Sequence, residues 1–216
     1  MMVKSLPGIA TVLVILGPAA AQYPEWKHSG SIYLLTTPEG ADLPASASEA
    51  DFPVLVRLHK DLFDFSQAKA NGEDIRFSAK GKTLAYQVEE WDAAKGVASI
   101  WVRIPVIKGD ARQEIKLYWG KEDAASESSG SAVFNAEDGF VTVLHLDEGL
   151  KDEVGTIAPK DAGSTVSDGM IGKGRHLEPG KGIDGGDHVT SYPFGDNPFT
   201  SEAWVRIESA GAACFG

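Results

Sequence analysis

Hydrophobic and polar residues alternate with a period of two along most of this chain. The alternation is clearest at residues 54–58, 98–104 and 115–119, and it is typical of strands that bury one face. Weaker alternation predicts further strands at residues 31–37, 74–78, 83–90, 141–146 and 203–207. A single short helical turn is predicted, around residues 65–70. Short strands separated by glycine-rich turns favour an all-β sandwich or jelly roll.

Two features suggest how the chain divides into domains. Residues 121–131 are polar and small, which is typical of a linker or of a long loop within one domain. Residues 204–207 predict a strand and residues 212–215 begin another apolar stretch, so we expect a fragment of a longer protein whose second domain is incomplete. Unpaired strand edges would then make residues 121–216 aggregate when expressed alone.

The first 21 residues have the pattern of a secretory signal peptide. Lys4 precedes a short apolar stretch, and Ala19, Ala20 and Ala21 supply the small residues that a signal peptidase needs before Gln22. We therefore expect an exported protein that is periplasmic, at the cell surface or secreted. No later apolar run is long enough to span a bilayer, so no direct membrane insertion is expected within these residues. Cys214 is the one cysteine, which rules out an internal disulfide.

The composition of the chain narrows its class and its partners. Hydrophobic residues make up 43% and charged residues 24% of the sequence, which is typical of a globular protein. The formal net charge of −11 disfavours nucleic acid and anionic lipid as partners, and otherwise serves solubility.

Catalytic motifs are absent from the sequence. It contains no nucleophile elbow, Walker loop, dinucleotide fingerprint, zincin helix or paired Cys-x-x-Cys. The five histidines are dispersed, with no pair at helical ligand spacing. We therefore predict that this chain is not an enzyme and has no catalytic residue.

One carboxylate cluster lies beside an aromatic residue, in the run Glu89-Glu90-Trp91-Asp92. Two carboxylates flanking a sugar could hydrolyse it, with Trp91 as a platform. However, adjacent residues of a strand point to opposite faces, so we expect solvated charges at a strand end.

Two other groups of charged residues are candidates for an ion pair and for a calcium site. Asp74 and Arg76 lie on one face of a predicted strand and are expected to form an ion pair. Asp184 and Asp187 lie in a glycine-rich loop that could wrap calcium. Because Asp-Gly is a common turn pair, a simple turn remains the alternative, and no other cofactor is expected.

The tryptophans are the main candidates for ligand binding. Trp119 shares the apolar face of its strand and is expected in the core. Trp101 and Trp204 alternate against the more apolar face, so we expect them to be exposed or to lie between layers. With Trp91 they form the candidate set for stacking on sugars or packing on a partner.

Several stretches, taken in order, resemble the bacterial domain of unknown function DUF2341. They are residues 51–58 (DFPVLVRL), 71–77 (NGEDIRF), 91–92 (WD), 100–105 (IWVRIP), 117–120 (LYWG) and 131–134 (SAVF).

Later stretches are similar to a concanavalin A-like, laminin-G-type domain. They are residues 144–149 (LHLDEG), 171–174 (IGKG) and 199–205 (FTSEAWV). Together the two resemblances imply two jelly-roll-like antiparallel β-sandwiches, the second truncated. The implied boundaries are a signal peptide at 1–21, a DUF2341-like sandwich at 22–120, a linker or loop at 121–136, and an incomplete laminin-G-type domain at 137–216.

The resemblances imply a binding role and carry over no catalytic residue. The expected function is an exported recognition module for polysaccharide, other glycans or an extracellular protein. One alternative is the extracytoplasmic part of a proton-channel complex of the MotA/TolQ/ExbB type. Another is the accessory region of a glycoside hydrolase, with Glu90 and Asp92 as the residues to test. Since fold does not fix function, these remain expectations.

Overall fold

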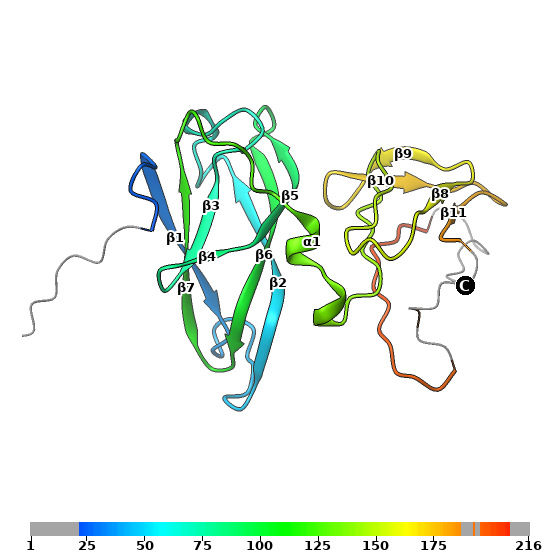
Figure 1. Ribbon diagram of the computed structural model, residues 1–216, viewed down its shortest axis with the longest axis horizontal. Coiled ribbons are helices and arrows are strands. Elements are labelled where there is room, and N and C mark those ends of the chain that lie inside the picture. Colours follow the sequence, from blue (N-terminus) through cyan, green and yellow to red (C-terminus); the bar gives the residue numbers. More distant parts are fainter. Residues whose placement is uncertain (1–21, 187–191, 193–194, 208–216) are drawn as a thin grey trace, which may run out of the picture.

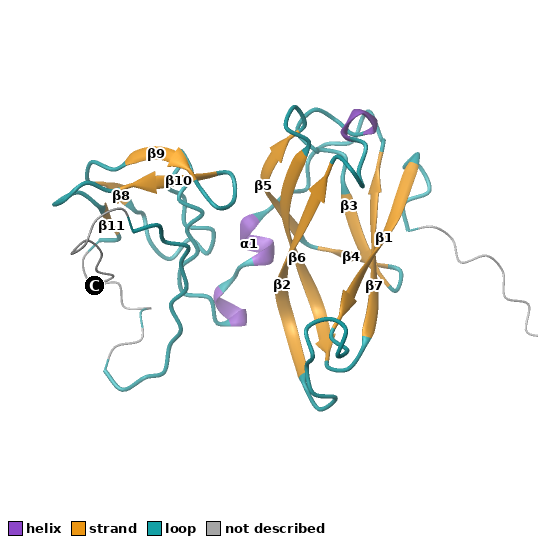
Figure 2. Cartoon of the chain, turned by 180° about the vertical axis from the view of Figure 1, so that it is seen from behind, coloured by secondary structure: helices purple, strands orange, loops and turns teal. Residues whose placement is uncertain are grey.

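The computed structural model describes residues 22–186, 192 and 195–207. The predicted signal peptide, Asp187 and Cys214 lie outside these residues. The described chain consists of antiparallel β-sheets with very little helix (Figure 2), which confirms the all-β prediction.

Two antiparallel sheets form a sandwich (Figure 1). One sheet has the order β1-β7-β3-β4 and the other has the order β2-β6-β5. The first sheet comprises β1 (His28–Leu35), β7 (Arg112–Trp119), β3 (Arg76–Ala79) and β4 (Lys82–Leu84). The second comprises β2 (Ser48–His59), β6 (Val97–Lys108) and β5 (Tyr86–Asp92).

The core lies between the two sheets and follows from the period-two pattern. In β6 the buried apolar residues Ala98, Ile100, Val102 and Ile104 alternate with residues of the outer face. They join apolar side chains of the opposite sheet and of the loops in one cluster. Burial of such side chains is the main favourable term in folding. The strands predicted at residues 54–58, 98–104 and 115–119 are thus confirmed as parts of β2, β6 and β7.

Two connections shape the sandwich. Lys80 and Gly81 both have positive φ angles in the hairpin between β3 and β4, the conformation that two-residue hairpins favour. Next, the backbone N–H of Arg103 donates to the carbonyl of Ala85, so the chain passes there from the first sheet to the second. The predicted helical turn is present as the 3-10 helix η1 (Phe65–Gln67).

The segment after β7 runs along the edge of β5. Ser129 N–H donates to the carbonyl of Tyr86, and Val88 N–H donates to the Ser128 hydroxyl. This segment leads into the helices α1 (Gly130–Val133) and η2 (Ala136–Asp138). Val133 and Phe134 are buried, so the stretch proposed as a linker or loop packs against the sandwich.

A second region follows, with β8 (Lys160–Asp161), β9 (Thr165–Asp168), β10 (Lys173–His176) and β11 (Ile183–Asp184). They form two ladders of two strands each, β9 with β10 and β8 with β11. The strands predicted at residues 141–146 and 203–207 are wrong. Leu144 makes only an isolated bridge with Asp152, and residues 203–207 have no paired strand among the described residues. A strand forms only where a neighbour satisfies its backbone groups.

Polar side chains organise this second region. The Asp152 carboxylate is buried and accepts hydrogen bonds from the backbone N–H groups of Val143, Val154, Thr156 and Ile157. Leu150 is the one buried apolar side chain that the structure describes beyond residue 140. The second region therefore depends more on side-chain-to-backbone hydrogen bonds than on an apolar core.

Candidate functional site

The three candidate tryptophans lie in three different environments. Trp91 packs edge-on against Phe63 and Phe65 beside the sandwich core. Trp101 lies on the outer face of β6, with its ring 5.5 Å from that of Phe134. Trp204 is 77% exposed. The structure therefore leaves only Trp204 of this set open to a ligand.

A bulge in β5 brings two carboxylates to the outer face of the second sheet. Val88 pairs with Ile100 whereas Glu90 pairs with Ser99, so Glu89 is an extra residue in the strand. Trp101 donates its indole N–H to Glu89, and the Ser99 hydroxyl donates to Glu90 over 3.2 Å. The expectation that Glu89 and Glu90 point to opposite faces is wrong, because a bulge interrupts the period-two alternation.

Polar partners from the segment beyond α1 complete an outer-face cluster. His145 Nδ1 lies 3.2 Å from the Glu89 carboxylate, and both side chains are only 10% exposed. The other ring nitrogen of His145 lies 3.0 Å from the side-chain oxygen of Gln87. Arg103 forms an ion pair of 2.7 Å with Asp138. We define the outer-face cluster as Gln87, Glu89, Trp101, Arg103, Asp138 and His145.

The polar groups of the outer-face cluster contact one another. The Glu89 carboxylate lies against His145 and accepts from the Trp101 indole, and the other ring nitrogen of His145 lies against Gln87. The aromatic contact of Phe134 with His145 closes the same region. The cluster therefore holds the segment after α1 against β5 and β6. His145 was not among the residues expected from the sequence. Gln87 lies two positions before Glu89 in the sequence, which indicates a polar face of this strand but not its partner.

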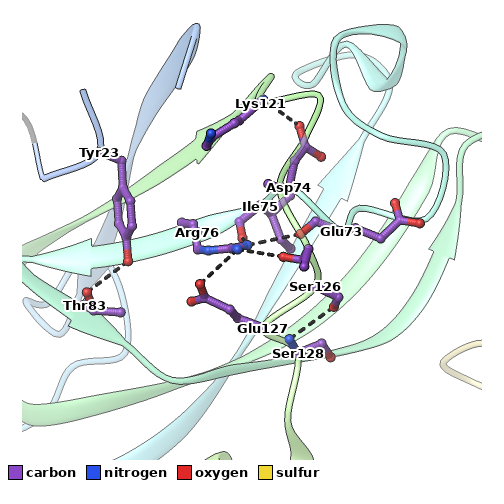
Figure 3. A network of polar contacts seen from close by, with 12 residues as sticks. Tyr23, Glu73, Asp74, Ile75, Arg76, Thr83, Lys121, Ser126, Glu127 and Ser128 are labelled. Atoms are coloured by element: carbon purple, nitrogen blue, oxygen red, sulfur yellow. Dashed lines mark hydrogen bonds and ion pairs between the residues drawn. The ribbon is translucent and has the colours of Figure 1, made fainter. Parts of the chain in front are cut away.

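A second polar network ties β3 to the segment after β7 (Figure 3). Asp74 is fully buried and accepts from the backbone N–H groups of Lys69 at 2.8 Å, Gly120 at 2.6 Å and Lys121 at 3.2 Å. Its three donors come from two loops. One carboxylate thus holds these loops together at one end of the sandwich.

Arg76 makes the other half of this network. Its guanidinium donates to the carbonyl of Ala125 over 2.7 Å and lies 3.0 Å from the Glu127 carboxylate. It also donates to the Tyr86 hydroxyl, and burial raises the pKa of that phenol. The predicted ion pair between Asp74 and Arg76 is wrong. Asp74 precedes β3, and its carboxylate oxygens accept hydrogen bonds from backbone N–H groups instead. Both residues are structural, but with other partners.

The remaining candidates make local contacts. Asp92 accepts from the backbone N–H of Lys95, which holds the pKa of this carboxyl below its usual value and caps the turn before β6. Asp184 accepts from Gly186 N–H over 2.8 Å, while Asp187 lies outside the described residues. Within the described part of the chain, no group of three or more His, Cys, Asp or Glu side chains is arranged to hold a metal ion.

The geometry defines an antiparallel β-sandwich whose second sheet carries an attached polar segment. Residues 71–148 match the family model of DUF2341, a domain of unknown function. The matched residues run from the turn before β3 to just beyond His145, and so include the whole outer-face cluster. No family match supports the resemblance of the later residues to a laminin-G-type domain. Neither the curated proteins nor the solved structures gave a match.

No helix among the described residues is long and apolar enough to cross a bilayer.

Proposed function

We propose that this chain is an exported, non-catalytic recognition module that binds glycans or other extracellular ligands. The observation that carries the proposal is the exposure of Trp204, at 77%, within a segment that also exposes Phe199, Val205 and Ile207. Contiguous exposed apolar patches are typical of interaction sites. An exposed indole offers a flat apolar face together with one hydrogen-bond donor.

The state of the carboxylates supports binding over hydrolysis. Glu89 and Glu90 accept hydrogen bonds from Trp101 and Ser99, and Asp92 caps a turn. A retaining or inverting glycosidase needs two carboxyl groups open to the sugar. Export follows from the predicted signal peptide at residues 1–21.

Retention on insoluble polysaccharides tests the proposal. The chain is passed over cellulose, chitin and mannan, and we expect retention on at least one of them that Trp204→Ala abolishes. Leu62→Ala is the matched control, since Leu62 is 94% exposed on the sandwich and its loss should leave retention unchanged. Trp101→Ala should retain binding too, because Phe134 covers that ring. No retention on any of the polymers, or equal loss with Leu62→Ala, would count against the proposal.

A further inference from the structure

The edges of the two sheets differ in how they are protected. An unprotected edge strand offers free N–H and C=O groups to another strand. The edge of β5 is covered by residues 128–129 of the same chain. The edge strand β2 contains Pro53, which has no N–H, and Asp51 with a φ of 52°. The edge strand β4 has only three residues.

The edge strand β1 has none of these protections. Its eight residues contain no proline, aspartate, glutamate, lysine or arginine. All eight pair with β7 in an unbroken register, from His28 with Trp119 to Leu35 with Arg112. Figures 1 and 2 both place β1 at the margin of the sandwich, on the side away from the second region. Among the described residues, no strand pairs with its outer edge.

The hydrogen bonds at the end of β1 show which backbone groups face outward. Thr36 N–H donates toward β7, to the carbonyl of Ala111, whereas the carbonyl of Leu35 faces the other way and accepts from Ala41 N–H. Successive residues of an antiparallel strand alternate between these two directions. The N–H and C=O groups of Ser29, Ser31 and Tyr33 therefore face away from β7. Among the described residues, none of these groups has a hydrogen-bond partner outside the strand.

We propose that β1 pairs in antiparallel fashion with β1 of a second copy of this chain, with the two-fold axis at Ser31. In this register Ser31 lies opposite Ser31 of the second copy, and Ser29 lies opposite Tyr33. Every outward N–H and C=O group of the three residues then has a partner. The four-stranded sheets of the two copies join into one continuous sheet with a closed two-fold interface.

The residues of β1 favour a second copy as the occupant. The outward N–H and C=O groups belong to Ser29, Ser31 and Tyr33 and are centred on Ser31, whereas the next outward carbonyl, that of Leu35, already accepts from Ala41. A second β1 in the reverse direction therefore presents the same groups at the same positions. The register also places small residues opposite large ones, Gly30 opposite Ile32 and Ser29 opposite Tyr33. Side chains directly opposite each other are in contact across strands, and these pairs avoid a clash. The residues of β1 themselves carry no carboxylate or ammonium group; the charge nearest the proposed axis is the Glu114 carboxylate of β7, which accepts from the Ser31 hydroxyl.

Cysteine cross-linking tests the register. In a Cys214→Ser background, Ser31→Cys places two thiols opposite each other at about 5.5 Å between Cα atoms, within the range of about 4.4–6.8 Å that a disulfide allows. We expect mild oxidation to give a covalent dimer. Tyr33→Cys is the matched control. Its two copies lie four positions apart along the strand, about 14 Å at about 3.4 Å per residue, and should not cross-link. Equal cross-linking of both variants would overturn the register.

Sedimentation tests the dimer itself and does not depend on the polysaccharide experiment. We expect the weight-average mass to approach twice that of one chain at about 100 µM. Ser31→Pro removes one outward N–H group and keeps the N–H groups that bond to β7. The weight-average mass should then fall to that of one chain. Ser31→Ala keeps the N–H and should leave the dimer intact. A monomeric wild-type chain, or a Ser31→Pro variant that remains dimeric, would refute the proposal.

Discussion

Replacing Asp74 with asparagine tests whether one buried carboxylate holds an end of the sandwich together. Asp74 is fully buried and accepts three backbone N–H groups, from Lys69, Gly120 and Lys121. Asparagine has the same shape but turns one oxygen into an NH2 group that faces a donor. Each hydrogen bond to a charged group contributes about 1.5–3 kcal/mol, and a buried unsatisfied donor costs about 1–3 kcal/mol. We therefore expect Asp74→Asn to lower the free energy of unfolding by about 3 kcal/mol.

This loss is large beside the total stability of a typical domain, about 5–15 kcal/mol. Urea unfolding followed by tryptophan fluorescence measures it, because Trp91 and Trp119 pack against the core. Asp123→Asn is the control, since that side chain is 82% exposed and a surface ion pair contributes little to stability. If the unfolding free energy of Asp74→Asn lies within about 1 kcal/mol of the wild-type value, the Asp74 carboxylate does not hold the two loops together.

Four further predictions concern other contacts. Gly72→Ala should lower the unfolding free energy by about 2–4 kcal/mol in urea titration, because Gly72 has a φ of +68° and a Cβ would lie 2.5 Å from the Trp91 ring; full stability would contradict it. Burial raises the pKa of Tyr86 above 10.0, so the folded state keeps this proton to higher pH than the unfolded state. This raised pKa contributes to the free energy of unfolding in full below about pH 10, and the contribution is lost as the pH rises from there through the folded pKa. Tyr86→Phe should reduce that loss when unfolding is measured as a function of pH. His145→Ala should expose residues 134–145 to limited proteolysis, while an unchanged digest would show that the outer-face cluster does not hold this segment. Residues 121–216 expressed alone should aggregate, since Val133 and Phe134 lose the sandwich that buries them; a soluble product with cooperative unfolding would refute this.

The sequence predicted the strands that bury one face in the core of the sandwich. In β2, β6 and β7 the apolar residues recur at every second position because one side of each strand faces the core. The 3-10 turn at Phe65–Gln67 was also predicted, and Asp64 caps it by accepting from Ser66. These signals are local, so a single sequence is enough to show them.

The remaining features depend on contacts that no local pattern shows. The strand predicted at residues 203–207 has suitable residues but no paired neighbour in the described chain. The extra residue Glu89 reverses the expected direction of one carboxylate, and no residue type marks such a bulge. The ion-pair partner of Arg76 is Glu127, which lies beyond four further strands in the chain. Within the candidate site, only the exposure of Trp204 agrees with the open platform that the sequence suggested.

The pairing of β1 with β7 has a consequence for the order of folding. His28, at the start of the first strand, lies beside Trp119, at the end of the last strand of the sandwich, so almost the whole intervening chain must be present before the first sheet can close. Contacts between residues so distant in sequence carry a large loop-closure entropy and slow the folding rate. The first sheet therefore stays open, and its half of the core stays uncovered, until residues 112–119 have been synthesised.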